Sequence, residues 1–337
     1  MRYGYACINM ALSYPQKYGG KERGVQPITT NRTMIRRTYD EKGTDYVSEL
    51  TLQNVKDLNE IIKWNILNGY DFFRLSSGMA PWKTEYEWSD LKDIDQIKQW
   101  FHSAGTMATT HNIRLTSHPG PFNVLVSPHD HDVENCIKDL TIHGDEFDMM
   151  GLSRTPYNKI NIHIGGAYGD KTSAMKRFCE NFHLLPDSVK SRLTVENDDK
   201  ASMYSVKDLY DGVYKVIGIP IVFDYHHHRF CTGGQSEEEA LKLAASTWAS
   251  DIKPVVHVSE SKALEYNDDK IRPQAHSDYV LNPINTYGQE QDVMLECKKK
   301  ELALLKYREI LLERSEVNEE SRDCRIGGNP HCASVYN

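Results

Sequence analysis

Eight short apolar runs recur along the chain, and most are followed by a segment whose hydrophobic residues repeat at helical spacing. The runs cover residues 2–8, 71–75, 112–117, 159–164, 192–195, 219–223, 254–258 and 292–295. Eight strands alternating with helices predict an α/β fold, the (β/α)8 or TIM barrel, with the active site at the C-terminal ends of the strands. A doubly wound open sheet is the alternative, but no G-x-G-x-x-G sequence follows the first run.

Helices are expected between these runs, at residues 51–68, 91–110, 132 onward, 172–184, 206–217, 237–249 and 298–312. Ser205 is placed to cap one of them and Gly218 to end it, while Ser236 and Glu239 form a capping box for another. Residues 9–50 are a long polar segment to which no element is assigned.

The length of 337 residues fits one large α/β domain. We expect residues 1–312 to form a single catalytic TIM-barrel domain. Residues 313–337 are polar and lack periodicity, so they are expected to be a flexible C-terminal tail.

The compartment expected from the sequence is intracellular, either cytoplasm or nucleus. No uninterrupted apolar run is long enough to span a membrane, and the N-terminus lacks the order of a signal peptide. The 7 cysteines are scattered without a C-x-x-C motif, which fits reduced thiols.

The formal net charge of −8 argues mildly against a nucleic-acid partner, although local charge at a binding face matters more. Residues 16–42 carry seven lysines and arginines against three acidic residues, a local charge of +4. This segment follows the first strand, at the expected mouth of the barrel. Phosphate contacts made by such a segment would weaken steeply with salt.

Histidines and carboxylates stand at or near six successive strand ends. They are His118, His163, Glu196, Asp224, His227, His257, His276 and Glu296. Asp224 and His227 are three residues apart just beyond a strand, so both can turn toward one point, whereas His226 and His228 are only neighbours. A lone residue of this kind is usually solvated or hydrogen-bonded in the core. Together, however, the carboxylates would repel one another unless cations lay between them.

Eight nitrogen and oxygen ligands without cysteine suit two or three divalent ions rather than a structural zinc site. Such a cluster can activate water and hold a phosphate for in-line displacement. A two-metal barrel can also isomerise sugars, so the residues alone leave both reactions open.

Short motifs along most of the chain resemble those of one family. They read GYACIN at 4–9, TNRT at 30–33, FRLSS at 73–77, SHPG at 117–120, HIGGAYG at 163–169, VEND at 195–198, VFDYHH at 222–227, VHVSE at 256–260, QAH at 274–276 and DVMLECK at 292–298. In this order they resemble the UV damage endonucleases, relatives of the endonuclease IV-type apurinic-site nucleases.

The resemblance implies a DNA repair endonuclease that nicks the phosphodiester bond immediately 5′ to UV photoproducts such as pyrimidine dimers, leaving a 3′-hydroxyl and a 5′-phosphate. It implies three divalent ions, with Mn²⁺ expected and Zn²⁺ or Mg²⁺ as alternatives, held by the same eight residues. Glu196, Glu296, Asp224 and His227 are then the expected catalytic residues. Damaged double-stranded DNA is the expected partner of a monomer without a nucleotide cofactor. An apurinic-site endonuclease, a sugar isomerase and a non-catalytic lesion-binding protein remain alternatives.

Residues expected to contact DNA or the lesion come from the same motifs or directly follow one of them. They are Tyr5, Asn9, Asn31, Arg32, Pro121, Phe122 and Tyr168. Crosslinked pyrimidines stack poorly, so an apolar side chain such as Phe122 can wedge between the bases at low cost. Asn9 and Asn31 are expected to orient the metal ligands, and Arg32 belongs to the basic segment.

Three positions depart from the family pattern. Residues 81–86 lack the histidine that members often carry after the second strand, and Glu85 is the only substitute offered there. Val255 stands where members can carry a lysine, two residues before His257. Pro121 and Phe122 replace a common Gln-Tyr pair, so the aromatic wedge lacks a hydroxyl.

Overall fold

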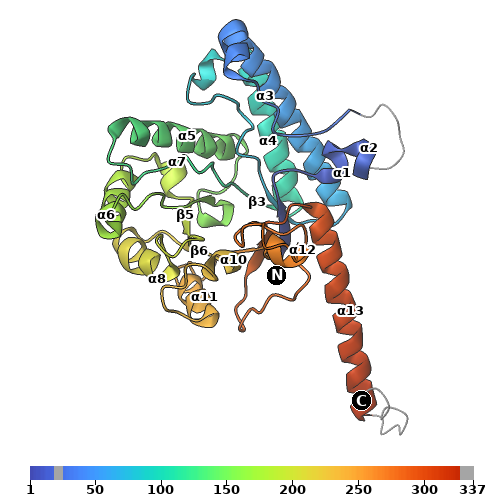
Figure 1. Ribbon diagram of the computed structural model, residues 1–337. Coiled ribbons are helices and arrows are strands. Elements are labelled where there is room, and N and C mark those ends of the chain that lie inside the picture. Colours follow the sequence, from blue (N-terminus) through green and yellow to red (C-terminus); the bar gives the residue numbers. More distant parts are fainter. Residues whose placement is uncertain (19–25, 327–337) are drawn as a thin grey trace.

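Eight parallel strands form a nearly closed barrel in the computed structural model, which describes residues 1–18 and 26–326 (Figure 1). The strands are β1 (Tyr3–Ala6), β2 (Phe72–Arg74), β3 (Arg114–Thr116), β4 (Ile160–Ile162), β5 (Leu193–Glu196), β6 (Ile221–Asp224), β7 (Val255–Val258) and β8 (Asp292–Leu295). Their order is β3-β2-β1-β8-β7-β6-β5-β4, and a parallel bridge between Ser117 and Ile160 joins the two ends. The predicted TIM barrel is confirmed, and each strand overlaps one predicted run.

Alternation along the strands separates the interior of the barrel from its helical shell. Val222, Val255 and Met294 pack together in a small apolar cluster with Ala6 and Phe72. Each of these three residues lies two positions before a predicted ligand on the same strand. On each of these strands, the side chains that face the barrel interior are therefore apolar deeper in the barrel and metal-ligand types at its mouth.

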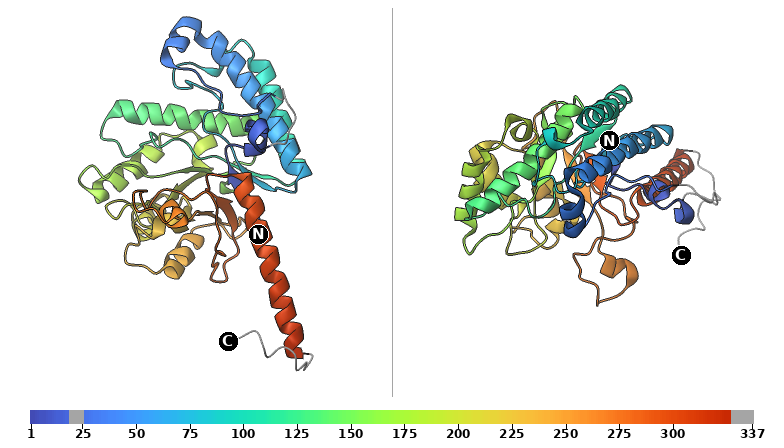
Figure 2. Two further views of the ribbon diagram at one scale, coloured as in Figure 1. Left: turned by 45° about the vertical axis from the view of Figure 1, so that its right-hand side comes forward. Right: turned by 90° about the horizontal axis from the view of Figure 1, so that it is seen from above.

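The helices surround the barrel, as the two views in Figure 2 show. They are α1 (Met10–Ser13), α2 (Pro15–Tyr18), α3 (Arg36–Leu67), α4 (Ile94–Thr110), α5 (Asp130–Met149), α6 (Lys171–Phe182), α7 (Asp187–Lys190), α8 (Val206–Leu209), α9 (Lys215–Ile217), α10 (Tyr225–His228), α11 (Glu237–Ala245), α12 (Lys262–Tyr266) and α13 (Glu301–Ile326). Short helical turns add η1 (Trp88–Asp90), η2 (Pro156–Asn158) and the π-helical η3 (Tyr210–Tyr214). The predicted caps at Ser205 and Ser236 are both present, and Gly218 ends α9 in the left-handed conformation.

Helix α3 begins at Arg36, well before the predicted start at residue 51. Its first turns lack an apolar stripe and are stabilised instead by ion pairs one turn apart, Arg36–Asp40 and Arg37–Glu41. Gly43 has a φ of 61° and marks a kink between two helical stretches. The hydrophobic pattern identified only the second stretch, because the fully buried residues of α3 begin at Val47.

Helix α13 continues past the predicted boundary at residue 312 and ends at Ile326. It packs against the barrel through Ala303, Leu304 and Tyr307, which are buried, and then projects away from it (Figures 1 and 2). The first half of the segment expected to be a flexible tail is therefore helical. Residues 327–337 lie outside the described residues.

Within the described residues, no helix is long and apolar enough to cross a membrane. Five described cysteines are free thiols, and four of them are buried. Burial raises the pKa of Cys136 to about 12 and that of Cys231 to about 11, so both thiols stay protonated and unreactive.

Candidate metal centre

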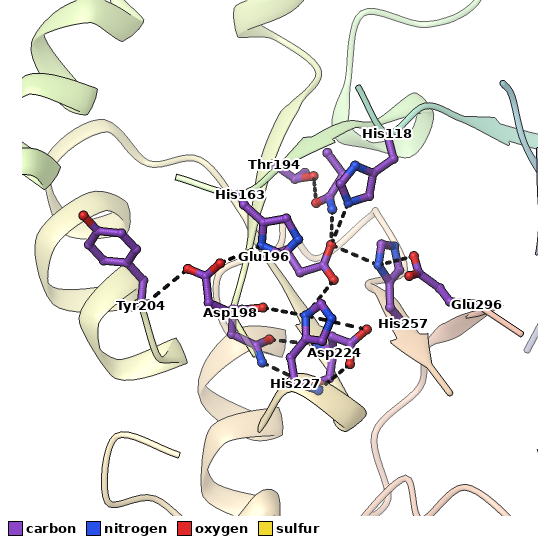
Figure 3. A network of polar contacts seen from close by, with 12 residues as sticks. His118, His163, Thr194, Glu196, Asp198, Tyr204, Asp224, His227, His257 and Glu296 are labelled. Carbon is purple, nitrogen blue, oxygen red and sulfur yellow. Dashed lines mark hydrogen bonds and ion pairs between the residues drawn. The ribbon is translucent and has the colours of Figure 1, made fainter. Parts of the chain in front are cut away.

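Glu196, at the end of β5, is the hub of a polar cluster at the barrel mouth (Figure 3). Its carboxylate is fully buried. His118 Nε2 lies 3.2 Å and His257 Nδ1 3.0 Å from Glu196 Oε2, and His227 Nδ1 lies 3.4 Å from Oε1. Three strand ends thus direct imidazole nitrogens at one carboxylate.

Seven of the eight predicted ligands fall into three groups of side chains whose ligand atoms lie within 4.8 Å of one another. The groups are His118, Glu196 and His257; His163, Glu196 and His227; and Asp224, His257 and Glu296. The eighth ligand, His276, belongs to no such group of described residues, although its ring lies 5.9 Å from that of His227. Because Glu196 and His257 each belong to two groups, neighbouring ions could share them.

The turn after β6 separates His227 from its two histidine neighbours. Asp224 is the N-cap of α10, and its Oδ1 accepts a hydrogen bond of 2.8 Å from the backbone N–H of His227. This turn directs the His227 ring back toward the cluster. His226 packs on Phe230 with the ring centroids 5.3 Å apart, and His228 packs on the ring of Phe223.

Several buried ligand atoms lack a hydrogen-bond partner among the described residues. They are Glu196 Oε1, Asp224 Oδ2 and the Nδ1 atoms of His163, His257 and His276. Carboxylate oxygens lie within ion-pair distance of the nitrogens of His163 and His257, but not in hydrogen-bond geometry. Leaving buried polar atoms unsatisfied is costly, and the cost is greatest for charged groups. Bound divalent cations would satisfy these nitrogen and oxygen atoms, and the donor set suits such ions. The residues present therefore fit a metal centre.

The ionisable groups of the cluster are strongly perturbed in the metal-free protein. Burial disfavours the charged form of His163, but the nearby carboxylates of Glu196 and Asp198 outweigh burial and raise its pKa to about 10. Burial likewise opposes ionisation of Glu196, but His257 and His163 hold its pKa well below the ordinary value. Burial raises the pKa of Asp224. Crowded carboxylates with divergent pKa values are typical of functional sites.

Two cationic residues at the centre were not among the predicted site residues. Arg74, at the end of β2, forms an ion pair with Glu296. Lys159, just before β4, is fully buried, and its Nζ lies 3.1 Å from Nε2 of His257. A charged residue inside an otherwise apolar strand run was the available signal for both.

Polar residues behind the ligands hold them in place. Asn161 Nδ2 donates a hydrogen bond to Glu196, and Asn161 Oδ1 accepts one of 2.7 Å from the Thr194 hydroxyl. Asp198 Oδ1 lies 3.2 Å from Nδ1 of His163. Such supporting hydrogen bonds orient metal ligands and tune their basicity.

Tyr5 and Asn9 do not lie where DNA could touch them, so their predicted contacts are corrected. Tyr5 faces the helical shell, fully buried, with its ring 5.0 Å from that of Phe73. Its hydroxyl donates to Asn65 Oδ1 at 2.7 Å and accepts from Asn9 Nδ2 at 3.1 Å. Asn9 is also buried and caps α1 by accepting from the N–H of Leu12. Both residues hold the first loop onto α3.

Asn31 and Arg32 occupy the same surface loop but differ in their availability. Asn31 is exposed and borders a cavity that Trp82 and Phe122 also line. The guanidinium of Arg32 pairs with Asp57 at 2.7 Å and donates to the backbone oxygens of Thr29 and Pro27. Arg32 therefore stabilises its loop, and the predicted phosphate contact does not fit this arrangement.

The described cations of the basic segment at 16–42 mostly lie beside a partner within the protein. Arg36 and Arg37 pair with carboxylates on α3, at 2.9 and 2.8 Å. Lys17 and Lys42 lie against the rings of Tyr18 and Tyr46. Lys21 and Arg23 lie outside the described residues.

Phe122, four residues after His118, is the most exposed aromatic residue among the described residues, at 73% of its surface. Its ring folds over Gly120, where an added Cβ would lie 2.5 Å from the ring, so a larger residue would displace it. Tyr168, at 48% exposure, follows the strand end that carries His163, and the Arg177 guanidinium lies 5.7 Å from its ring. Both rings have the exposure that base stacking requires.

The two remaining departures from the family pattern have structural counterparts. Glu85 pairs with Arg36 at 3.4 Å on the surface and is in none of the candidate metal groups of the described residues, so it does not replace the missing histidine. Val255 packs in the apolar interior of the barrel. An amine nevertheless reaches His257, because Lys159 extends from the opposite side of the barrel.

Fold and site together define a TIM-barrel protein whose mouth gathers buried histidines and carboxylates able to bind metal ions. A family model described as UV-endonuclease UvdE matches residues 1–324. The UV DNA damage endonucleases of Bacillus thuringiensis subsp. konkukian (strain 97-27) and Bacillus anthracis are each 32% identical over 318 residues, covering 91% of this chain and 93% of theirs. The crystal structure of SacUVDE matches with a TM-score of 0.77 at 29% identity, over 94% of this chain and 99% of that one. The chain therefore belongs to the UV-endonuclease UvdE family and is a DNA repair endonuclease.

Proposed function

We propose that this protein nicks DNA immediately 5′ to UV photoproducts, leaving a 3′-hydroxyl and a 5′-phosphate, and that the reaction depends on divalent metal ions. The observation that carries the proposal is the convergence of seven predicted ligands at the barrel mouth. Several of their buried atoms lack partners among the described residues. Without cations, burying these unsatisfied polar atoms would strongly destabilise the fold, so we infer that the cluster binds metal ions.

We propose three ions, with Mn²⁺ as the first choice and Zn²⁺ or Mg²⁺ as alternatives. The three overlapping ligand groups support more than one ion, and the mixture of imidazole and carboxylate suits Mn²⁺ or Zn²⁺. His276, close to His227, would complete one of the sites. When bound, the ions would supply an activated water nucleophile and charge stabilisation at the phosphate and the leaving 3′-oxygen.

The side chains of the cluster have distinct tasks in this proposal. Glu196 stays ionised because the surrounding histidines lower its pKa, so it can bridge cations. Burial opposes ionisation of Glu296, and the nearby Arg74 overcomes this effect, holding the pKa of Glu296 well below its ordinary value. Asp224 and His227 act as a pair whose geometry is set by the α10 cap.

Lesion recognition in this proposal rests on exposed apolar groups beside the metal centre. Phe122 would wedge between the bases, where a crosslinked dinucleotide already stacks poorly. A cavity of about 740 Å³, bordered by Phe122, Trp82 and Asn31, lies next to it and could receive an unstacked base. Sequence-independent recognition of this kind needs no side chain that reads base edges.

The proposal is tested on supercoiled plasmid, irradiated or not, with Mn²⁺ or with EDTA. We expect nicking of the irradiated plasmid in Mn²⁺ only, and loss of nicking in His227→Ala. A plasmid with apurinic sites separates the related activity, which the proposal does not require. Equal nicking of irradiated and control plasmid would exclude lesion specificity, and full nicking in EDTA would exclude metal dependence.

A further inference from the structure

A buried polar network lies beneath the loop that presents Phe122. Asn123 Nδ2 donates to Asp139 Oδ2 on α5 at 2.8 Å and to the backbone oxygen of Gly120 at 3.1 Å. The backbone N–H of Asn123 also donates to that oxygen, at 3.2 Å. Residues 120–123 therefore form a tight turn that is fastened to α5, with Phe122 at its tip.

Lys83 supplies the cation of this network. Its Nζ lies 3.1 Å from Asp139 Oδ1, 2.7 Å from His143 Nε2 and 3.2 Å from the backbone oxygen of Ser77. Burial opposes ionisation of Asp139, but Lys83 and His143 outweigh it and lower its pKa, which keeps this carboxylate charged. One lysine thus joins the loop after β2 to helix α5.

The network also reaches the other end of the Phe122 loop. His143 Nδ1 lies 3.1 Å from the Ser117 hydroxyl and 3.4 Å from Glu146 Oε2. Ser117 immediately precedes the predicted metal ligand His118. Both ends of the segment between His118 and Asn123 are therefore held by side chains of the same helix.

Packing alone does not account for so many buried polar groups. Apolar residues of similar size would hold a helix against a loop at least as well, because burying charges costs desolvation energy. A charged network instead favours one arrangement, since each alternative leaves a buried charge unpaired. The tip is not held in the same way, because Phe122 remains 73% exposed.

We propose that Lys83, through Asp139 and Asn123, positions Phe122 relative to His118, so that wedging at a lesion places the scissile phosphate at the metal centre. Lys83, Asp139, Asn123 and Phe122 all border the same cavity, so the network supports the wall against which DNA would lie. This proposal rests on the proposed function. Lys83 is a positioning residue in it and touches neither the metal ions nor the phosphate.

The test is a double-mutant cycle on a duplex with one defined photoproduct, with kcat/KM for nicking as the readout. We expect Lys83→Met and Phe122→Ala each to lower kcat/KM by about tenfold or more. If Lys83 acts through Phe122, the double variant is no slower than Phe122→Ala alone, because the wedge is already absent. Mn²⁺ binding measured by calorimetric titration stays within about twofold of wild type, since the ligands are intact.

Two controls distinguish this idea from a folding defect and from failure of the proposed function. Lys92→Met removes an exposed lysine that pairs with Glu49 at 2.8 Å, and it should leave nicking unchanged. Asn123→Ala, which removes the neutral link between Asp139 and the loop, replaces Lys83→Met if that variant does not fold. If the wild type nicks the lesion duplex but the losses of kcat/KM in the two single variants multiply in the double variant, the positioning role alone is overturned. Wild type that does not nick the lesion duplex overturns the proposed function, and the positioning role with it.

Discussion

Lys159 places an amine at the floor of the metal centre, where it faces a ligand histidine. Burial lowers its pKa to about 7, and its Nζ faces Nε2 of His257 at 3.1 Å. This contact leaves Nδ1 of His257 facing Glu196 and Glu296, 3.0 Å from each. Lys159, which is not itself a predicted ligand, therefore helps to determine which ring nitrogen of His257 faces the metal centre.

Replacing Lys159 by methionine should weaken Mn²⁺ binding by about 10- to 100-fold, because partners behind a ligand typically contribute that much to affinity. Calorimetric titration of the metal-free protein measures the change. Lys207→Met, which removes an exposed lysine paired with Asp211 at 2.9 Å, serves as the control. Unchanged Mn²⁺ affinity in the Lys159 variant would show that His257 needs no support from the amine.

Asp139 gives a prediction for the dependence of stability on pH. Its pKa in the folded protein lies below the ordinary value of 3.8, because Lys83 and His143 outweigh the effect of burial. A lowered folded pKa contributes stability above pH 3.8, and that stability is lost as the pH falls through the folded pKa. Asp139→Asn removes this contribution and leaves buried Lys83 without its carboxylate, a cost of about 3 to 5 kcal/mol.

Urea denaturation at neutral pH should therefore show Asp139→Asn less stable than wild type. The difference should shrink once the pH falls below 3.8, where wild type loses the same ionised pair. A difference that stays constant into acid would mean that Asp139 is not held ionised by its partners.

At the scale of elements, helices α4 and α5 approach each other closely at one glycine. A Cβ added at Gly105 would lie 1.8 Å from the backbone oxygen of Met150, which follows α5. Replacing a glycine within a helix by alanine normally stabilises the helix by about 1 kcal/mol. Here the clash is with backbone rather than with a flexible side chain, so its cost must exceed the gain in helix stability.

Gly105→Ala should lower the free energy of unfolding by about 1 to 3 kcal/mol, the usual cost of overpacking a core. Thr106→Ala, one residue further along and exposed, is the matched control and should be neutral or slightly stabilising. Thermal and urea denaturation measure both variants. A stabilised Gly105→Ala would mean that the two helices separate at little cost.

The strands and their ends could be predicted from the sequence, because a strand buried on both faces leaves a continuous apolar run. The ligands were identifiable for the same reason, since Asp224 and His257 interrupt such runs where apolar residues would be expected. The contact of Lys159 with His257 could not be foreseen, because it depends on which strands face each other across the barrel. The start of α3 was missed because its first turns carry a single aromatic contact, Tyr39 against Trp82, rather than a repeating apolar stripe.

Tyr5 illustrates a different limit. It was assigned to lesion contact by its place in a motif, yet it lies between Gly4 and Ala6, two small residues on the same strand. Alternation puts Ala6 in the narrow interior and Tyr5 against the helical shell. A motif predicts which residues matter, but the face of the strand decides what each residue touches.

At the scale of the whole molecule, the chain concentrates its function at one end of the barrel. The described strands supply apolar layers below and ligands above, and the Phe122 loop rises beside them. The net charge is −8, and Arg36 and Arg37 of the basic segment are paired with acidic residues of their own helix. We therefore attribute specificity to lesion distortion and to the metal centre rather than to strong non-specific attraction to DNA.

The most direct test of this account is cleavage of a duplex that carries one defined UV photoproduct, mapped to the nucleotide in the presence of Mn²⁺. The account predicts a single nick immediately 5′ to the lesion, with a 3′-hydroxyl and a 5′-phosphate, and no nick in EDTA or with His227→Ala. A nick at another position, or cleavage that persists in His227→Ala, would contradict the claim that the barrel-mouth cluster performs the incision.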